Sequence, residues 1–73
     1  MKNFTFTAYI EKDEESGMYI GIVPTLKGAH TCAETLDELQ IKLQEVVSLC
    51  IEEMSNDEII SLPTFAGLTQ IVL

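Results

Sequence analysis

One histidine and two cysteines are the residues of this chain whose chemistry is most often catalytic or metal-binding. His30 and Cys32 stand two positions apart, so on a strand both side chains would point to the same side. A thiol activated by an imidazole is a nucleophile, and a small hydrolase using this pair is one hypothesis. No residue is placed by the sequence to orient the imidazole. Packing of a short edge strand is therefore the favoured interpretation of both residues.

The sequence also has few of the residues that a metal, phosphate or cofactor site needs. His30, Cys32 and Cys50 cannot complete a tetrahedral zinc site without a carboxylate or a second chain. The four glycines are isolated from one another, so no glycine-rich phosphate loop is present. We therefore expect no catalytic residues, no metal and no cofactor, and a protein that is not an enzyme.

The charge of the chain bears on its partners. Twelve acidic residues oppose four lysines, which gives a net charge of −8. Contacts to a phosphate backbone need a lysine- and arginine-rich surface, so direct binding of nucleic acid is disfavoured. A basic protein is the complementary partner. The alternative is that the acids only keep a small apolar domain soluble.

Three short strands are predicted in the first half of the chain. Side chains alternate over residues 3–10, with Tyr9 on the face opposite Ile10, and residues 18–23 form a second strand. Residues 11–17 are charged and end in glycine, which predicts a hairpin loop. Pro24 ends the second strand because it cannot donate to the ladder, and residues 29–32 are a third short strand.

A long amphipathic helix is predicted over residues 36–54. Thr35 and Glu38 have the spacing of a capping box, and Asn56 is the expected C-terminal cap. Positions three or four apart give a stripe for burial: Leu36, Leu39, Leu43, Val46, Val47, Cys50 and Met54. Residues 57–68 are expected to connect this helix to a final strand over residues 69–73. The predicted fold is α+β, a two-layer β-β-β-α-β unit whose long helix covers one sheet face.

Acidic and apolar residues mix on the outer side of this helix and beyond its end. Glu34, Asp37 and Glu38 complement the helix N-terminus, whereas the acids at the other end oppose the helix dipole. Together with two outward-facing apolar residues they predict a surface for a protein partner. The candidate partner-binding residues are Ile41, Glu45, Leu49, Glu52, Glu53, Asp57 and Glu58.

The order of these features resembles the HicB-like antitoxin family. The matching motifs are Gly17-x-Tyr19, Val23-Pro24, Gly28 and Thr35-Leu36-x-Glu38, and the resemblance covers essentially the whole chain. It implies a partial RNase H-like fold that binds and blocks a small basic HicA-like toxin ribonuclease. Ala29 and Ala33 depart from the family pattern, which has Cys and Gly at those places, so the loop around them is expected to differ.

Length and composition predict a single cytoplasmic domain over residues 1–73. Two cysteines are too few for a disulfide framework, the start is no signal peptide, and no apolar stretch approaches a membrane span. We expect no C-terminal DNA-binding domain, although many members of the resembled family carry one. A domain this small buries little surface alone, so a homo-oligomer is expected, and an orphan homo-oligomeric domain without a toxin is the alternative function.

Overall fold

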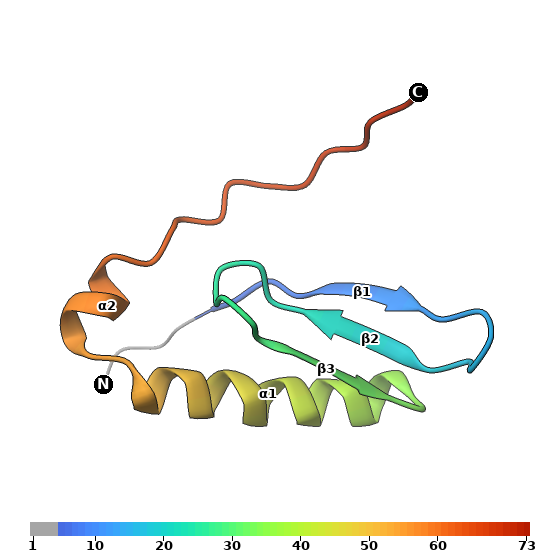
Figure 1. Cartoon of the computed structure of the whole chain (residues 1–73), viewed down its shortest axis with the longest axis horizontal. Coiled ribbons are helices and arrows are strands. Elements are labelled where there is room, and N and C mark those ends of the chain that lie inside the picture. The colour runs from blue at the N-terminus through green and yellow to red at the C-terminus, as the bar shows by residue number, and fades with distance from the viewer. Residues whose placement is uncertain (1–4) are drawn as a thin grey trace.

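A three-stranded antiparallel sheet with one long helix against it forms the body of the protein (Figure 1). The structure, a computed structural model, describes residues 5–73. The strands are β1 (Tyr9–Lys12), β2 (Tyr19–Ile22) and β3 (His30–Ala33), and the helices are α1 (Leu36–Glu53) and α2 (Asn56–Ile60). The strands lie in the order β1-β2-β3, so β2 is central and the other two are edges. The predicted α+β class, antiparallel sheet and long helix are confirmed.

The first hairpin lies further along the chain than predicted. Glu11 and Lys12, expected in the loop, instead pair with Ile20 and Tyr19. Residues 5–8 are not part of the sheet, and residues 3 and 4 lie outside the described residues. The reversal is tight because the Gly17 N–H donates to the Asp13 carbonyl at 2.8 Å, with Gly17 at a φ of 74° that favours glycine. The hairpin loop is therefore two residues shorter than predicted, because Glu11 and Lys12 belong to β1.

The turn after Pro24 connects β2 to β3 and is closed by main-chain hydrogen bonds. The Val23 N–H donates to Ala29 O at 2.9 Å, and the Ala29 N–H donates to Leu26 O at 3.0 Å. Gly28 takes a φ of 80°, which a side chain would disfavour. Val23, Leu26 and Ala29 belong to this turn, and their side chains are buried.

The hydrophobic core lies between this turn, the sheet and α1. Its buried members are Val23, Leu26, Ala29, Ala33, Leu39 and Leu43. Phe6, Ala8, Tyr19, Val46, Val47, Cys50 and Met54 pack against them at the margin. The predicted helical stripe is therefore confirmed except at Leu36, which is 52% exposed because it begins the helix beyond the sheet.

Helix α1 begins as the sequence predicts. Thr35 is the N-cap, and its hydroxyl oxygen accepts a hydrogen bond from the Glu38 N–H at 3.1 Å. The Glu38 carboxylate makes an ion pair with Lys42, whose Nζ lies 3.3 Å away. Only the first half of the predicted reciprocal capping box is therefore recorded, and Glu38 supports the helix through an i,i+4 pair.

Removing this cap should lower stability measurably. Thr35→Ala leaves an N–H of the first turn without its acceptor and is expected to cost about 1 kcal/mol of unfolding free energy. Thr35→Ser keeps the hydroxyl and should lose much less. Urea denaturation followed by circular dichroism measures both variants. Equal losses in the two variants would show that the hydroxyl does not cap α1.

A second, short helix was not predicted, and it changes the role assigned to Asn56. Asn56 does not cap α1, whose C-cap is Met54; Asn56 is the first residue of α2. Ser55 is the N-cap of α2, and Ser55 and Glu58 form a complete capping box, with both hydrogen bonds between 3.1 and 3.2 Å. The Ser-x-x-Glu spacing at 55–58 is the sequence signal that identifies this helix.

The fourth strand predicted over residues 69–73 is wrong for the chain as it stands in this structure. No sheet pairing is recorded for these residues within the described part of the chain. After α2 the chain extends away from the sheet to the C-terminus (Figure 1). A strand needs an edge to pair with, and a terminal segment that meets none stays extended but unpaired.

Candidate functional site

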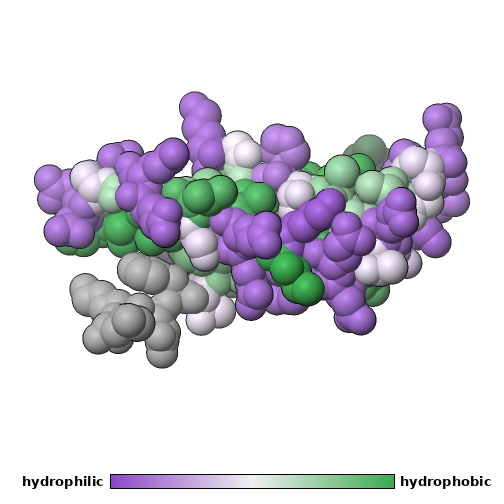
Figure 2. Space-filling view, turned by 90° about the horizontal axis from the view of Figure 1, so that it is seen from below, coloured by the Kyte–Doolittle hydropathy of each residue, from purple (hydrophilic) through white to green (hydrophobic). Residues whose placement is uncertain are grey.

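The outer side of α1 carries apolar and acidic residues along one line. Ile41, Glu45, Leu49 and Glu52 recur at spacings of four, four and three, which places them on one face of the helix. Ile41 is 58% exposed and Leu49 is 59% exposed, on the side opposite buried Leu39 and Leu43. Seen from the α1 side, the surface is mostly hydrophilic with separate apolar areas (Figure 2). We call these four residues the outer stripe.

The end of α1 carries negative charge, and no ion pair with these acids is found among residues 5–73. Glu52 and Glu53 are exposed in the last turn, which has no basic residue. The helix dipole is itself negative at this end, so both carboxylates lie in an unfavourable field that a cation would relieve. In the described part of the chain, the recorded ion pair lies at the other end of α1, between Lys42 and Glu38.

The acidic side chains at Asp57 and Glu58 have a structural role that was not predicted from the sequence. Both lie in the first turn of α2, where acidic side chains complement the positive end of the dipole. Glu58 also accepts the Ser55 N–H through Oε1 at 3.1 Å. Both residues remain exposed. They can still contact a partner, but their presence does not require one.

The structure separates the seven candidate residues into two groups. Ile41, Glu45 and Leu49 line one shallow depression on α1 together with Gln44 and Ser48. Glu53 and Glu58 line another depression beside Cys50 and Met54, where α1 passes into α2. Glu52 belongs to the outer stripe, and Asp57 lies in the first turn of α2. The candidate surface therefore follows one side of α1 and ends at the α1–α2 junction.

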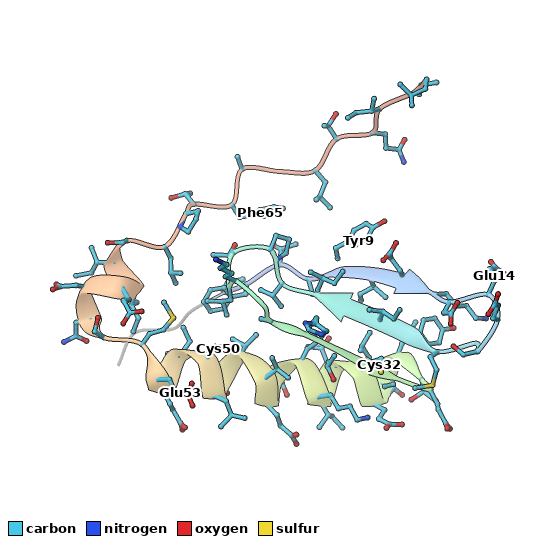
Figure 3. All side chains as sticks on the ribbon, viewed as in Figure 1. Tyr9, Glu14, Cys32, Cys50, Glu53 and Phe65 are labelled. Atoms are coloured by element: carbon cyan, nitrogen blue, oxygen red, sulfur yellow. The ribbon has the colours of Figure 1, made fainter. Side chains whose placement is uncertain are left out.

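His30 and Cys32 do point to the same side of β3, as their spacing predicted. Ala33 on this strand is buried toward α1, whereas His30 and Cys32 are exposed on the sheet face away from the helix. His30 Nδ1 lies 3.0 Å from the Gly28 carbonyl oxygen, so the ring donates there. Figure 3 shows Cys32 well separated from Cys50, and both thiols are free. Among residues 5–73, no three His, Cys, Asp or Glu side chains converge as metal ligands.

The hairpin at the far end of the sheet holds a second group of acids. The Ser16 hydroxyl donates to Asp13 Oδ2 at 2.7 Å, and this hydrogen bond lowers the pKa of the Asp13 carboxyl. Glu14 and Glu15 are exposed in the same turn. Figure 3 places Glu14 at the opposite end of the molecule from Glu53. The two acidic ends can therefore be tested independently.

Residues 68–73, which we call the C-terminal segment, expose apolar side chains where a strand was predicted over residues 69–73. Leu68 is 69% exposed, Ile71 82% and Val72 92%. No charged residue follows Glu58 in the sequence. The absence of charged residues after Glu58 is the feature of the sequence that distinguishes this segment from the acidic remainder of the chain.

Over residues 5–73, neither helix has an apolar stretch of the length needed to cross a lipid bilayer. No family model matches the chain. No solved structure matches it either.

Curated relatives are similar over most or all of the chain. A UPF0150 protein of a Synechocystis strain is 41% identical over 73 residues and covers 100% of both chains. A UPF0150 protein of Thermotoga maritima is 41% identical, over 97% of this chain and 95% of its own. One from Archaeoglobus fulgidus is 45% identical over 53 residues, 73% of this chain and 75% of its own. Identity at this level over full-length matches means that the chain belongs to the UPF0150 family.

Proposed function

We propose that this protein is a non-catalytic docking module that binds a small basic protein and blocks its active surface. The partner class is a HicA-like toxin ribonuclease, in keeping with the sequence resemblance to HicB-like antitoxins. The contact surface consists of the outer stripe and the acids at the α1–α2 junction. The observation that carries the proposal is the combination of exposed Ile41 and Leu49 with the carboxylates of Glu45 and Glu52 on the same side of one helix.

Charge and apolar contact have separate tasks in such a complex. A net charge of −8 attracts a basic partner over distance and raises the association rate. Glu45, between the two apolar residues of the stripe, fixes the approach of a cationic side chain. Ile41 and Leu49 then lose water on contact, which slows dissociation.

The resemblance also implies a finer fold than the sheet and helix described above. In a partial RNase H-like unit the segment after the helix supplies a fourth strand to the sheet. Residues 69–73 have the composition for it, with β-branched Thr69, Ile71 and Val72. We propose that this strand forms when the segment meets a sheet edge.

The second candidate function is an orphan homo-oligomeric domain that has no toxin partner. The apolar C-terminal segment favours it, since Leu68, Ile71 and Val72 are left uncovered by the rest of the chain. Apolar side chains gathered in this way usually mark an interaction surface. The two functions use different parts of the molecule, so one protein can have both.

Charge reversal at the α1 end tests the docking proposal. The double variant Glu52→Lys/Glu53→Lys is expected to weaken binding of a HicA-like ribonuclease from the same organism at least roughly tenfold. Calorimetric titration at two salt concentrations measures this, and wild-type affinity should fall as salt is raised.

The matched control is Glu14→Lys/Glu15→Lys, which changes net charge equally at the opposite end of the molecule (Figure 3). This control should reduce affinity much less, because it weakens only the long-range attraction between the two proteins. Equal losses in the two double variants would mean that only net charge matters. Undisturbed binding in both would reject the α1 surface.

A further inference from the structure

The sheet has two edges that differ in how well they are protected. In β3, the outward-facing carbonyl of Cys32 accepts a hydrogen bond from Lys42 Nζ at 3.1 Å, and α1 packs mainly beneath this strand. A charged side chain over an edge is a common device against further strand pairing. The β3 edge is thus partly closed by residues of its own chain.

The β1 edge is open. The Asp13 N–H donates to Met18 O at 2.8 Å, so the main-chain groups of Asp13 face β2. In an antiparallel pair this direction repeats at every second residue, so the main-chain groups of Glu11 and Tyr9 also face β2. The main-chain groups of Ile10 and Lys12 consequently point away from the sheet, and no partner for them is recorded among residues 5–73. All four residues of β1 are exposed, including Tyr9 at 46% and Ile10 at 47%. A strand could be added at this position.

The C-terminal segment has the properties of the missing strand. Its last five residues, Thr-Gln-Ile-Val-Leu, include three β-branched side chains and no charge. Ile71 and Val72 are more than 80% exposed, and the segment runs clear of the sheet beyond Phe65 (Figures 1 and 3). Residues 63–67 precede it and span at most roughly 17 Å when extended, enough to reach a neighbouring molecule.

We infer that two copies of this chain associate by exchanging these segments, so that residues 69–73 of each copy pair with the β1 edge of the other. The inference stands without the toxin-binding proposal and rests on the second candidate function, because it specifies how the homo-oligomer would form. An exchange of this kind is isologous: one two-fold contact satisfies both open edges and covers both apolar segments. The exposed face around Tyr9 and Ile22 then lies beside the incoming strand.

Charge decides which occupant fits. Two copies each carry a charge of −8 and repel one another through their acidic surfaces. The segment after Glu58 has no charged side chain, so pairing through it adds no acidic side chain to the contact with β1. Main-chain hydrogen bonds to Ile10 and Lys12 do not depend on the sign of the partner's charge. A basic partner, in contrast, gains nothing from this segment and is attracted to the acidic side of α1.

Proline substitution in the exchanged strand tests the inference on the full chain. Ile71→Pro removes a donor and cannot join a ladder, and at 82% exposure it disturbs no core contact. We expect wild type to sediment at twice 8.1 kDa and Ile71→Pro to have a dimer dissociation constant at least roughly tenfold higher. Ala66→Pro, outside the paired strand, is the matched control and should dimerise as wild type does.

A mixture of two differently labelled chains then shows whether the C-terminal segment of one copy lies at the β1 edge of the other. One chain is labelled with ¹⁵N, and the other is unlabelled and carries a spin label at Leu73→Cys in a Cys32→Ser/Cys50→Ser background. Exchange predicts broadening of the ¹⁵N amide signals of Tyr9 to Lys12 in the mixture. A monomer at all concentrations, a dimer indifferent to Ile71→Pro, or ¹⁵N amide signals of Tyr9 to Lys12 that stay sharp in the mixture each overturns the inference. Glu52→Lys/Glu53→Lys should leave the dimer intact, so failure of toxin binding is distinguishable from failure of exchange.

Discussion

Leu39→Ala is expected to destabilise the fold by about 2–5 kcal/mol, the range for truncating a fully buried leucine. Leu39 is 0% exposed and is the largest completely buried side chain together with Val23. It joins α1 to the turn before β3, where Leu26 and Ala29 are also buried. A domain of this size has roughly 4–11 kcal/mol of total stability, so this one change removes a large part of it.

Leu49→Ala is the matched control, because it is the same chemical change on the same helix. Leu49 is 59% exposed in the outer stripe, so its truncation should alter stability by less than about 0.5 kcal/mol. Urea unfolding of both variants gives the comparison directly. Similar losses would contradict the assignment of the two sides of α1. If Leu49→Ala stays stable but weakens ribonuclease binding, the outer stripe is a contact surface as proposed.

The elements predictable from the sequence were those specified by local interactions. Thr35 and the spacing of Leu39 and Leu43 define a start and a buried face within α1 itself, so both could be predicted without knowing the rest of the fold. The existence of the hairpin was predictable from Gly17, but its first strand was predicted over residues 3–10 and lies at Tyr9–Lys12. Helix α2 was missed because Asn56 was interpreted as the end of one helix, although Ser55 and Glu58 already had the capping-box spacing.

The strand at residues 69–73 was predicted wrongly for a different reason. Its composition is correct for a strand, but pairing depends on an edge elsewhere in space, and composition cannot say which one. The same distinction applies to the candidate site. The helical wheel identified Ile41 and Leu49 as outward-facing, since that follows from periodicity. It could not show that Asp57 and Glu58 belong to a second helix, because the periodicity of α1 says nothing of the chain after Met54.

Leu43 of α1 packs closely over Gly21 of β2, so a side chain at Gly21 should be poorly tolerated. A Cβ built on Gly21 would lie 2.9 Å from Leu43 Cδ1 and 3.0 Å from Cδ2, closer than such atoms pack. Leu43 is 8% exposed, so its side chain has little room to move away. Gly21→Val, which adds three carbons at this contact, is expected to cost about 1–3 kcal/mol or more through overpacking.

A double-mutant cycle separates this contact from the strand propensity of the new residue. In the wild-type background Gly21→Ala should destabilise, because the collision with Leu43 outweighs the reduced entropy of the unfolded chain. After Leu43→Ala has removed the colliding atoms, Gly21→Ala should become neutral or stabilise by about 0.4–1 kcal/mol, since Gly21 does not require a positive φ. Urea titration of the four proteins gives the coupling energy between the two sites. Additive effects would mean that α1 does not rest on Gly21, and the placement of the helix over β2 and β3, which leaves the outer stripe on the exposed side of α1, would then have to be revised.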